Sequence, residues 1–193
     1  MCDEHSLAEL APENESLVKK AVDSLSSAIP ALREIDRTLN AAALKARARD
    51  VDASGLSLYE IRSLQETARF TLGSLLLTQA RIFPRGNAER AASVLDAEEI
   101  FRRQASGVPG ETVTWNARVA MAECERLKAD PKSALAIIAG IEKDDPPADV
   151  RDRLKAVHAQ TLFDTGRPDE ALSLLLAYQK QRMPLPPELQ FLK

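Results

Sequence analysis

The chain contains 193 residues, of which 45% are hydrophobic, 28% are charged and only 4% are aromatic. A chain of this length removes roughly 70% of its unfolded surface from water on folding, so a true hydrophobic core is expected. The net charge of -3 lacks the basic excess typical of nucleic-acid-binding proteins. No apolar run approaches the ~20 residues of a bilayer span, so no membrane span is predicted. Ala and Leu supply most of the apolar content, which favours an all-α fold.

Residues 1–12 are acidic and are predicted to be flexible, although Ser6 and Glu9 have the spacing of a capping box. The start lacks the basic and apolar regions of a signal peptide, so the sequence predicts a cytoplasmic protein. An exported or lipid-anchored bacterial protein is the alternative. Cys2 followed by Asp3 resembles the start of a mature lipoprotein, provided that Met1 was added for expression.

Residues 13–50 are predicted to be helical because apolar residues recur there in steps of three and four, with a break at Asp36. Pro30 lies inside this stripe, so the segment is expected to be either kinked or split into two nearly collinear helices. The stripe is compatible with a hairpin that packs on the rest of the chain or with a coiled coil to a partner chain. Its members are Val18, Val22, Leu25, Ile29, Leu32, Leu39 and Ala43.

Residues 56–109 are predicted to form a hairpin of two long helices. Ser57 and Glu60 have the spacing of a capping box, and the helix that they open should stop near Phe83. Turn residues follow at 84–87. The second helix is expected over residues 88–104, before the glycines and proline of residues 107–110.

A spacing of 37 residues relates three alanines, each of which has a large apolar residue four positions further on. A helix–turn–helix unit with such a period cannot bury its apolar face alone and predicts stacked hairpins. Asp130 before Pro131 marks a helix start, and Gly166 marks a left-handed helix end. The three pairs are Ala97 with Phe101, Ala134 with Ile138 and Ala171 with Leu175.

The segment 153–181 resembles a tetratricopeptide repeat, with Ala159 at the small position of the first helix and Gly166 at the turn. The segment 115–146 is similar. Residues 66–77 followed by 97–109 fit with an insertion between them, and Leu72 and Gly73 match the family's first-helix pair. Four residues depart from the family pattern because they stand where it prefers apolar side chains. They are Arg69, Arg118, Lys155 and His158.

The repeat period and the resemblance together predict antiparallel helical hairpins stacked as a short, tetratricopeptide-like α-solenoid in a single domain, 13–193. Its expected parts are the N-terminal helical segment 13–50, a first hairpin 56–109, a second repeat 112–146 and a third repeat 149–183. Residues 184–193 are expected to be a partial cap or the truncated start of another repeat.

No arrangement of a nucleophile with a base, metal ligands or a phosphate-binding glycine loop is visible, so the sequence predicts neither an enzyme nor a cofactor or metal site. His158 has the position of a hydrogen-bonded packing residue, with a catalytic base as the alternative. Cys124 is expected to be a small buried hydrophobic side chain. Neither Cys2 nor Cys124 indicates a disulfide framework.

The resemblance implies a scaffold or adaptor that binds a peptide or protein segment along a concave surface lined by the first helix of each repeat. Only Arg153 fits the family's clamp for a carboxyl terminus. The alternative is a self-assembling structural domain, because Leu189, Phe191 and Leu192 introduce apolar residues at the end of the array. The candidate peptide-binding residues are Phe70, Ser74, Asn116, Glu123, Arg126, Arg153, Gln160 and Phe163.

Overall fold

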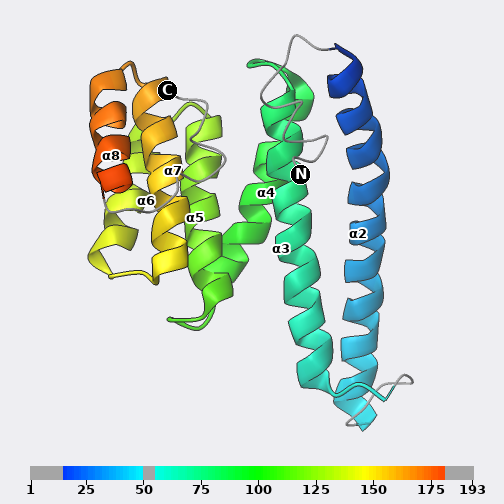
Figure 1. Ribbon diagram of the computed structural model, residues 1–193. Coiled ribbons are helices and arrows are strands. Elements are labelled where there is room, and N and C mark those ends of the chain that lie inside the picture. The colour runs from blue at the N-terminus through cyan, green and yellow to red at the C-terminus, as the bar shows by residue number, and fades with distance from the viewer. Residues whose placement is uncertain (1–14, 50–54, 181–193) are drawn as a thin grey trace. The chain divides into compact units, whose positions relative to one another are not determined.

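The structure is a computed structural model that describes residues 15–49 and 55–180, and these residues confirm an all-α fold (Figure 1). The predictions for residues 1–12 and 184–193 and for Cys2 lie outside the described residues. Helix packing in adjacent pairs is that of stacked antiparallel hairpins. The helices are α2 (Glu15–Arg49), α3 (Leu58–Ile82), α4 (Ala88–Ala105), α5 (Thr112–Leu127), α6 (Pro131–Lys143), α7 (Ala148–Asp164) and α8 (Pro168–Lys180).

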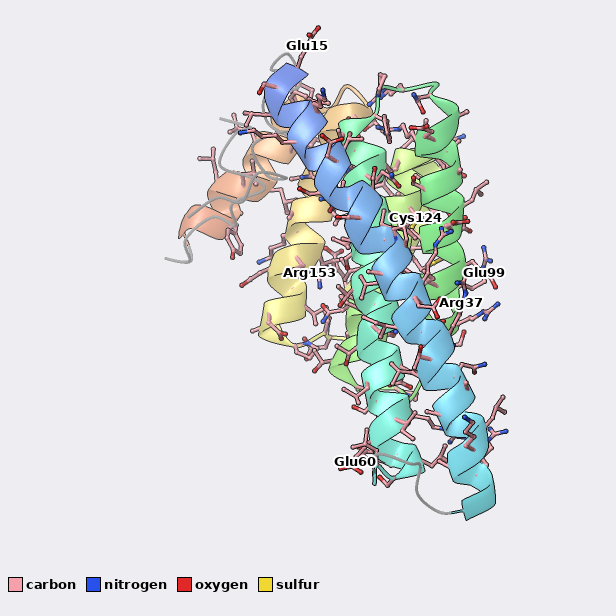
Figure 2. All side chains as sticks on the ribbon, turned by 90° about the vertical axis from the view of Figure 1, so that its right-hand side faces the viewer. Glu15, Arg37, Glu60, Glu99, Cys124 and Arg153 are labelled. Carbon is pink, nitrogen blue, oxygen red and sulfur yellow. The ribbon has the colours of Figure 1, made fainter. Side chains whose placement is uncertain are left out.

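The chain divides within α4 into two compact units, one ending at Ile100 and the other beginning at Phe101. The single domain expected over 13–193 stays a prediction. In the first unit α2 packs along α3. The two helices are antiparallel: Glu15 at the start of α2 and Glu60 in the first turn of α3 lie at opposite ends of the pair (Figure 2).

Helix α2 is continuous through Pro30, so of the two predicted alternatives, a kinked segment or two collinear helices, the second is excluded. The residue at position 30 is exposed, while Leu25 and Ile29 of the apolar stripe are buried. Packing of this stripe stabilises the helix beyond what its own propensity provides, which is how a helix can tolerate a proline that costs about 3 kcal/mol.

The ends of the helices in the first unit follow from local side-chain hydrogen bonds. Ser57 and Glu60 form the predicted capping box, in which the Ser57 hydroxyl accepts from the Glu60 amide and the Glu60 carboxylate accepts from the Ser57 amide. The Asn87 side chain caps α4 by accepting from the amides of Glu89 and Arg90 at 2.7 and 3.2 Å. These contacts confirm the predicted start of α3 and the turn before α4.

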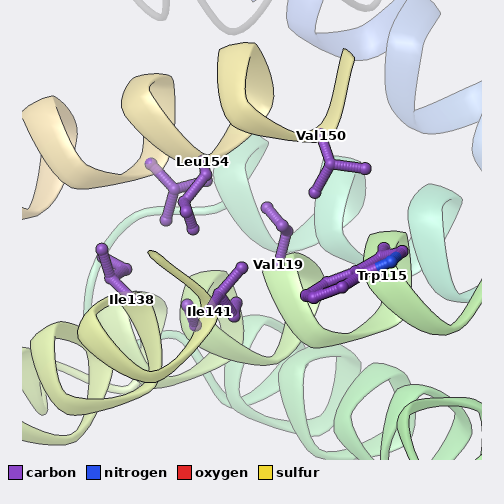
Figure 3. Close-up of a cluster of buried hydrophobic side chains, with 8 residues drawn as sticks. Trp115, Val119, Ile138, Ile141, Val150 and Leu154 are labelled. Carbon is purple, nitrogen blue, oxygen red and sulfur yellow. The ribbon is translucent and has the colours of Figure 1, made fainter. Parts of the chain in front are cut away.

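Helices α5 to α8 form two antiparallel hairpins in the second unit, and α7 packs against both α5 and α6. The core of this stack gathers side chains from three helices: Trp115 and Val119 from α5, Ile138 and Ile141 from α6, and Val150 and Leu154 from α7 (Figure 3). A smaller cluster, which includes Ala159, Leu162, Ala171 and Leu175, joins α7 to α8. The alanines of the 37-residue spacing are all buried, as close helix packing requires.

The two hairpin turns of the second unit have the same backbone geometry, although their sequences differ. Ala129 and Gly166 each have a left-handed backbone, with φ of 62° and 71°. Each donates to the carbonyl three residues earlier, and the next amide donates to the carbonyl five residues earlier, which is a Schellman motif. The left-handed stop at Gly166 was predicted, but the one at Ala129 was not, because alanine rarely adopts this conformation.

Replacing Ala129 with glycine is expected to raise the free energy of unfolding by about 0.5–1 kcal/mol, because glycine adopts a positive φ without steric cost. The matched change is Gly166→Ala, which places a β-carbon on the equivalent left-handed residue and is expected to lower stability by about 1 kcal/mol. Urea unfolding followed by circular dichroism measures both effects. A destabilising Ala129→Gly change would contradict the assignment of a strained turn.

Candidate functional site

Six of the eight candidate binding residues lie in the second unit, at equivalent positions of α5 and α7 that are 37 residues apart. We refer to these six residues as the α5/α7 face. They are the pairs Asn116 with Arg153, Glu123 with Gln160, and Arg126 with Phe163. Since α5 packs against α7, the fold brings equivalent residues of two successive hairpins close together.

The first pair is joined by a direct hydrogen bond. The Arg153 guanidinium, through Nη1, donates to the Asn116 side-chain oxygen at 2.7 Å. The Arg153 side chain is exposed on α7, where Figure 2 shows it, and Asn116 is partly buried on α5. This bond crosses from one hairpin to the next, so it positions the arginine on the surface of the α5/α7 face.

Arg126 is held inside a network of carboxylates and faces little solvent. Its guanidinium lies 2.9 Å from the Asp164 carboxylate of α7 and 3.4 Å from the Glu123 carboxylate of α5. The exposed fractions of the Arg126 and Glu123 side chains are only 12% and 9%. Their charges are therefore engaged within the protein, and we assign them the role of linking α5 to α7.

Phe163 is the exposed aromatic member of the α5/α7 face, since 52% of this large apolar residue is accessible to solvent. It directly precedes Asp164 at the end of α7, beside the ion pair to Arg126. Gln160, one turn earlier, is partly buried. The face thus combines one accessible aromatic ring with polar groups that are already ordered by contacts between the two helices.

Phe70 and Ser74 lie on α3 in the first unit, apart in sequence from the other six candidates. Both are partly buried, and the Ser74 hydroxyl donates to the Phe70 carbonyl at 2.9 Å. This bond to the preceding helical turn is the usual contact of a serine within a helix. The candidate site of the second unit is therefore built from the α5/α7 face alone.

The four residues that depart from the family pattern all have polar or aromatic neighbours. Arg69 lies 2.7 Å from Asp36, which also explains the break in the α2 stripe, and Arg118 lies 2.7 Å from Asp144 and over the Trp115 ring. The Lys155 ammonium lies over the Tyr178 ring, 4.8 Å from its centre. His158 Nδ1 lies 3.5 Å from the Glu142 carboxylate.

Tyr178 links α8 to α7 through its hydroxyl group. Its side chain is buried and its hydroxyl hydrogen-bonds to Asp152 of α7. Burial, and to a smaller extent the bond to the Asp152 carboxylate, raise the pKa of the Tyr178 phenol above its usual value. The neutral phenol is therefore the form that the fold favours.

Stability is expected to fall as the pH rises above about 10, because the unfolded chain then loses the Tyr178 proton more readily than the folded protein does. The contribution is fully present below the unfolded pKa and is lost as the pH rises through the folded one. Urea unfolding at a series of alkaline pH values should show that the free energy of unfolding of Tyr178→Phe falls less steeply with pH than that of the wild type. The phenylalanine ring keeps the contact with Lys155. Tyr59→Phe, at the exposed second tyrosine, is the control, and equal slopes in all three proteins would contradict the assignment.

A pocket of about 520 Å³ lies between α6, α7 and α8, and sequence reasoning did not predict it. Its apolar lining includes Leu135, Ile138, Leu162 and Leu174, and its polar lining includes Glu142, His158, Arg167 and Glu170. His158 was predicted to be hydrogen-bonded, and its Nδ1 nitrogen does not confirm this prediction. The buried Nδ1 has no hydrogen-bond partner within the part of the chain that the structure describes.

Cys124 is fully buried in α5, which confirms its prediction as a small hydrophobic side chain. Among the described residues, no group of three or more His, Cys, Asp or Glu side chains is placed to hold a metal ion. None of the described helices is both long enough and apolar enough to cross a membrane.

Comparisons with known proteins found no match among protein-family models, curated proteins or solved structures. The resemblance to tetratricopeptide repeats therefore rests on the residues of this chain.

Proposed function

We propose that the protein is a non-enzymatic scaffold or adaptor that binds a peptide or protein segment on the α5/α7 face. The observation that carries this proposal is the half-exposed Phe163 beside polar groups that are held in place by contacts between successive hairpins. Exposed aromatic residues contribute strongly to protein interfaces because they bury a large area at a small cost in conformational entropy. The resemblance to tetratricopeptide repeats supports the same surface.

The polar part of the face suits neutral hydrogen-bonding groups better than a strongly charged ligand. The charge of Arg126 is compensated by Asp164 and Glu123, and the Arg153 guanidinium is oriented by Asn116. A segment that places an apolar side chain on Phe163 and backbone groups near Gln160 and Arg153 would use both features. Preordered side chains lower the entropic cost of such binding.

The test compares Phe163→Ala with Leu172→Ala in affinity capture from a lysate of the native organism. Leu172 is the matched control because it is 45% exposed in the same unit but lies on α8. We expect only the Phe163 variant to lose a discrete partner. Its affinity for that partner should fall about thirtyfold if the ring supplies the ~2 kcal/mol of an interface hot spot. A photo-crosslinking residue at position 163 should then form a crosslink to that partner. Equal capture by both variants would sink the proposal.

Self-assembly is the second candidate function. Leu172 and Leu176 lie one turn apart on α8, and both are nearly half exposed, which gives this helix an apolar strip on its surface. Capture of copies of the chain itself, lost on Leu172→Asp but kept by Phe163→Ala, would support assembly. Light scattering that gives the same monomer mass for all three proteins over a wide concentration range would exclude it.

A further inference from the structure

The pocket between α6, α7 and α8 has an apolar floor and an acidic mouth, and it is independent of the proposed α5/α7 function. Its volume of about 520 Å³ falls within the range of small-molecule sites, which is roughly 300–1,000 Å³. Ile138 and Leu162 are buried at its floor, and Leu135 and Leu174 are partly buried beside them. A ligand body of aliphatic character would remove the partly buried Leu135 and Leu174 from water.

The charges around the mouth are unequally compensated. The Glu170 carboxylate accepts two hydrogen bonds of 2.5 Å from the Arg167 guanidinium, which lowers the pKa of Glu170 and neutralises its charge locally. The Glu142 carboxylate, from α6, faces His158 of α7, and the side chain of Glu142 is 48% exposed. The pocket therefore presents a net negative charge at Glu142.

Two hydrogen-bonding atoms meet at this point. His158 Nδ1 and a Glu142 carboxylate oxygen lie 3.5 Å apart, and the Nδ1 atom is buried without a hydrogen-bond partner within the described residues. When the imidazole is neutral with its proton on the other nitrogen, Nδ1 is an acceptor. Because Nδ1 is shielded from solvent, a ligand nitrogen in the pocket can reach the Glu142 carboxylate but not Nδ1.

We propose that this pocket binds a small organic cation, a primary ammonium group on an aliphatic body. The ammonium donates to the Glu142 carboxylate, and the aliphatic body packs against the partly buried Leu135 and Leu174, next to Ile138 and Leu162. A charge-assisted hydrogen bond to the Glu142 carboxylate supplies most of the specificity, because such bonds are about twice as strong as neutral ones.

The test titrates the full chain with three hexyl compounds at about pH 8, where ordinary histidines are neutral. They are n-hexylammonium, 1-hexanol and n-hexyltrimethylammonium, which differ in charge and in N–H groups at the same chain length. Nuclear magnetic resonance follows the methyl groups of Ile138 and Leu162 and the nitrogens of His158. We expect millimolar binding of hexylammonium, with shifts at both residues and at the imidazole, and binding about tenfold weaker or worse for the other two compounds.

Two variants complete the test. Glu142→Gln, at a half-exposed side chain, is expected to weaken hexylammonium binding about tenfold, whereas Glu111→Gln, at the exposed N-cap residue of α5 outside the pocket, should leave it unchanged. Unchanged circular dichroism confirms that each variant is folded. Equal binding of hexylammonium and hexanol, equal affinities of wild type and Glu142→Gln, or no methyl shifts in the millimolar range would each overturn the proposal.

Discussion

Replacing Leu154 with alanine is expected to lower the free energy of unfolding by about 2–5 kcal/mol. The side chain is 1% exposed and lies in the cluster where α5, α6 and α7 meet (Figure 3). Its loss removes buried apolar surface and leaves a cavity that neighbouring side chains of a packed stack can only partly fill. Because the second hairpin contacts the first through α7, the change weakens the packing between hairpins as well as within one.

Urea unfolding followed by tryptophan fluorescence measures this effect at the site itself. Trp115 is the single tryptophan of the chain and belongs to the same cluster as Leu154. The control is Leu172→Ala, since that leucine is 45% exposed and its truncation should change stability by no more than about 0.5 kcal/mol. A similar loss in both variants would mean that Leu154 is not a core residue.

Replacing Arg126 with alanine is expected to cost about 3 kcal/mol of stability. The guanidinium compensates Glu123, whose side chain is 9% exposed, and Asp164, whose side chain is 28% exposed. Without it, two poorly solvated carboxylates lose the cation that they share. The loss should be smaller than for a fully satisfied network, because Arg126 Nε is buried without a hydrogen-bond partner in the described part of the chain.

Two further proteins make this prediction specific. Arg33→Ala removes an ion pair between α2 and α4 whose partners are about half exposed, so its cost should stay below about 1 kcal/mol. The double variant Arg126→Met with Glu123→Met should recover part of the loss, because the buried Glu123 carboxylate is then removed together with the guanidinium that compensates it. Additive losses in the double variant would show that the two residues do not interact.

This role changes how binding data at position 126 are to be read. Sequence reasoning placed Arg126 and Glu123 among residues that contact a ligand, since helix positions in successive repeats share a face. The structure buries both and pairs them. A weaker interaction in an Arg126 variant would thus report lost stability, whereas Phe163 and Arg153 remain accessible to a partner.

The helices of this fold were predictable where their ends carry local signals. Ser57 with Glu60, and Asp130 before Pro131, mark helix starts through side chains only a few residues apart, and the structure contains both caps. The stop at Gly166 belongs to the same group. Such signals need no knowledge of the tertiary structure, so sequence alone defined the element bounds well.

Features that depend on contacts between distant segments were not predictable in the same way. Asp36 and Arg69 each looked like an interruption of an apolar pattern, and only the register of α2 against α3 pairs them. The left-handed Ala129 carries no glycine signal, although its equivalence to Gly166 by the 37-residue spacing could have revealed it. The α6/α7/α8 pocket arises from packing of three helices, which a periodic pattern does not specify.

The polar contacts between α5 and α7 also distinguish the two hairpins from each other. The apolar core contains similar residues in both hairpins. Apolar packing alone would therefore allow two copies of the same hairpin to stack. In a duplicated first hairpin, Asn116 would face a second asparagine, and the place of Asp164 would be taken by Leu127. The unlike residues at equivalent positions therefore make this packing specific to two different hairpins, and they disfavour swapping one for the other.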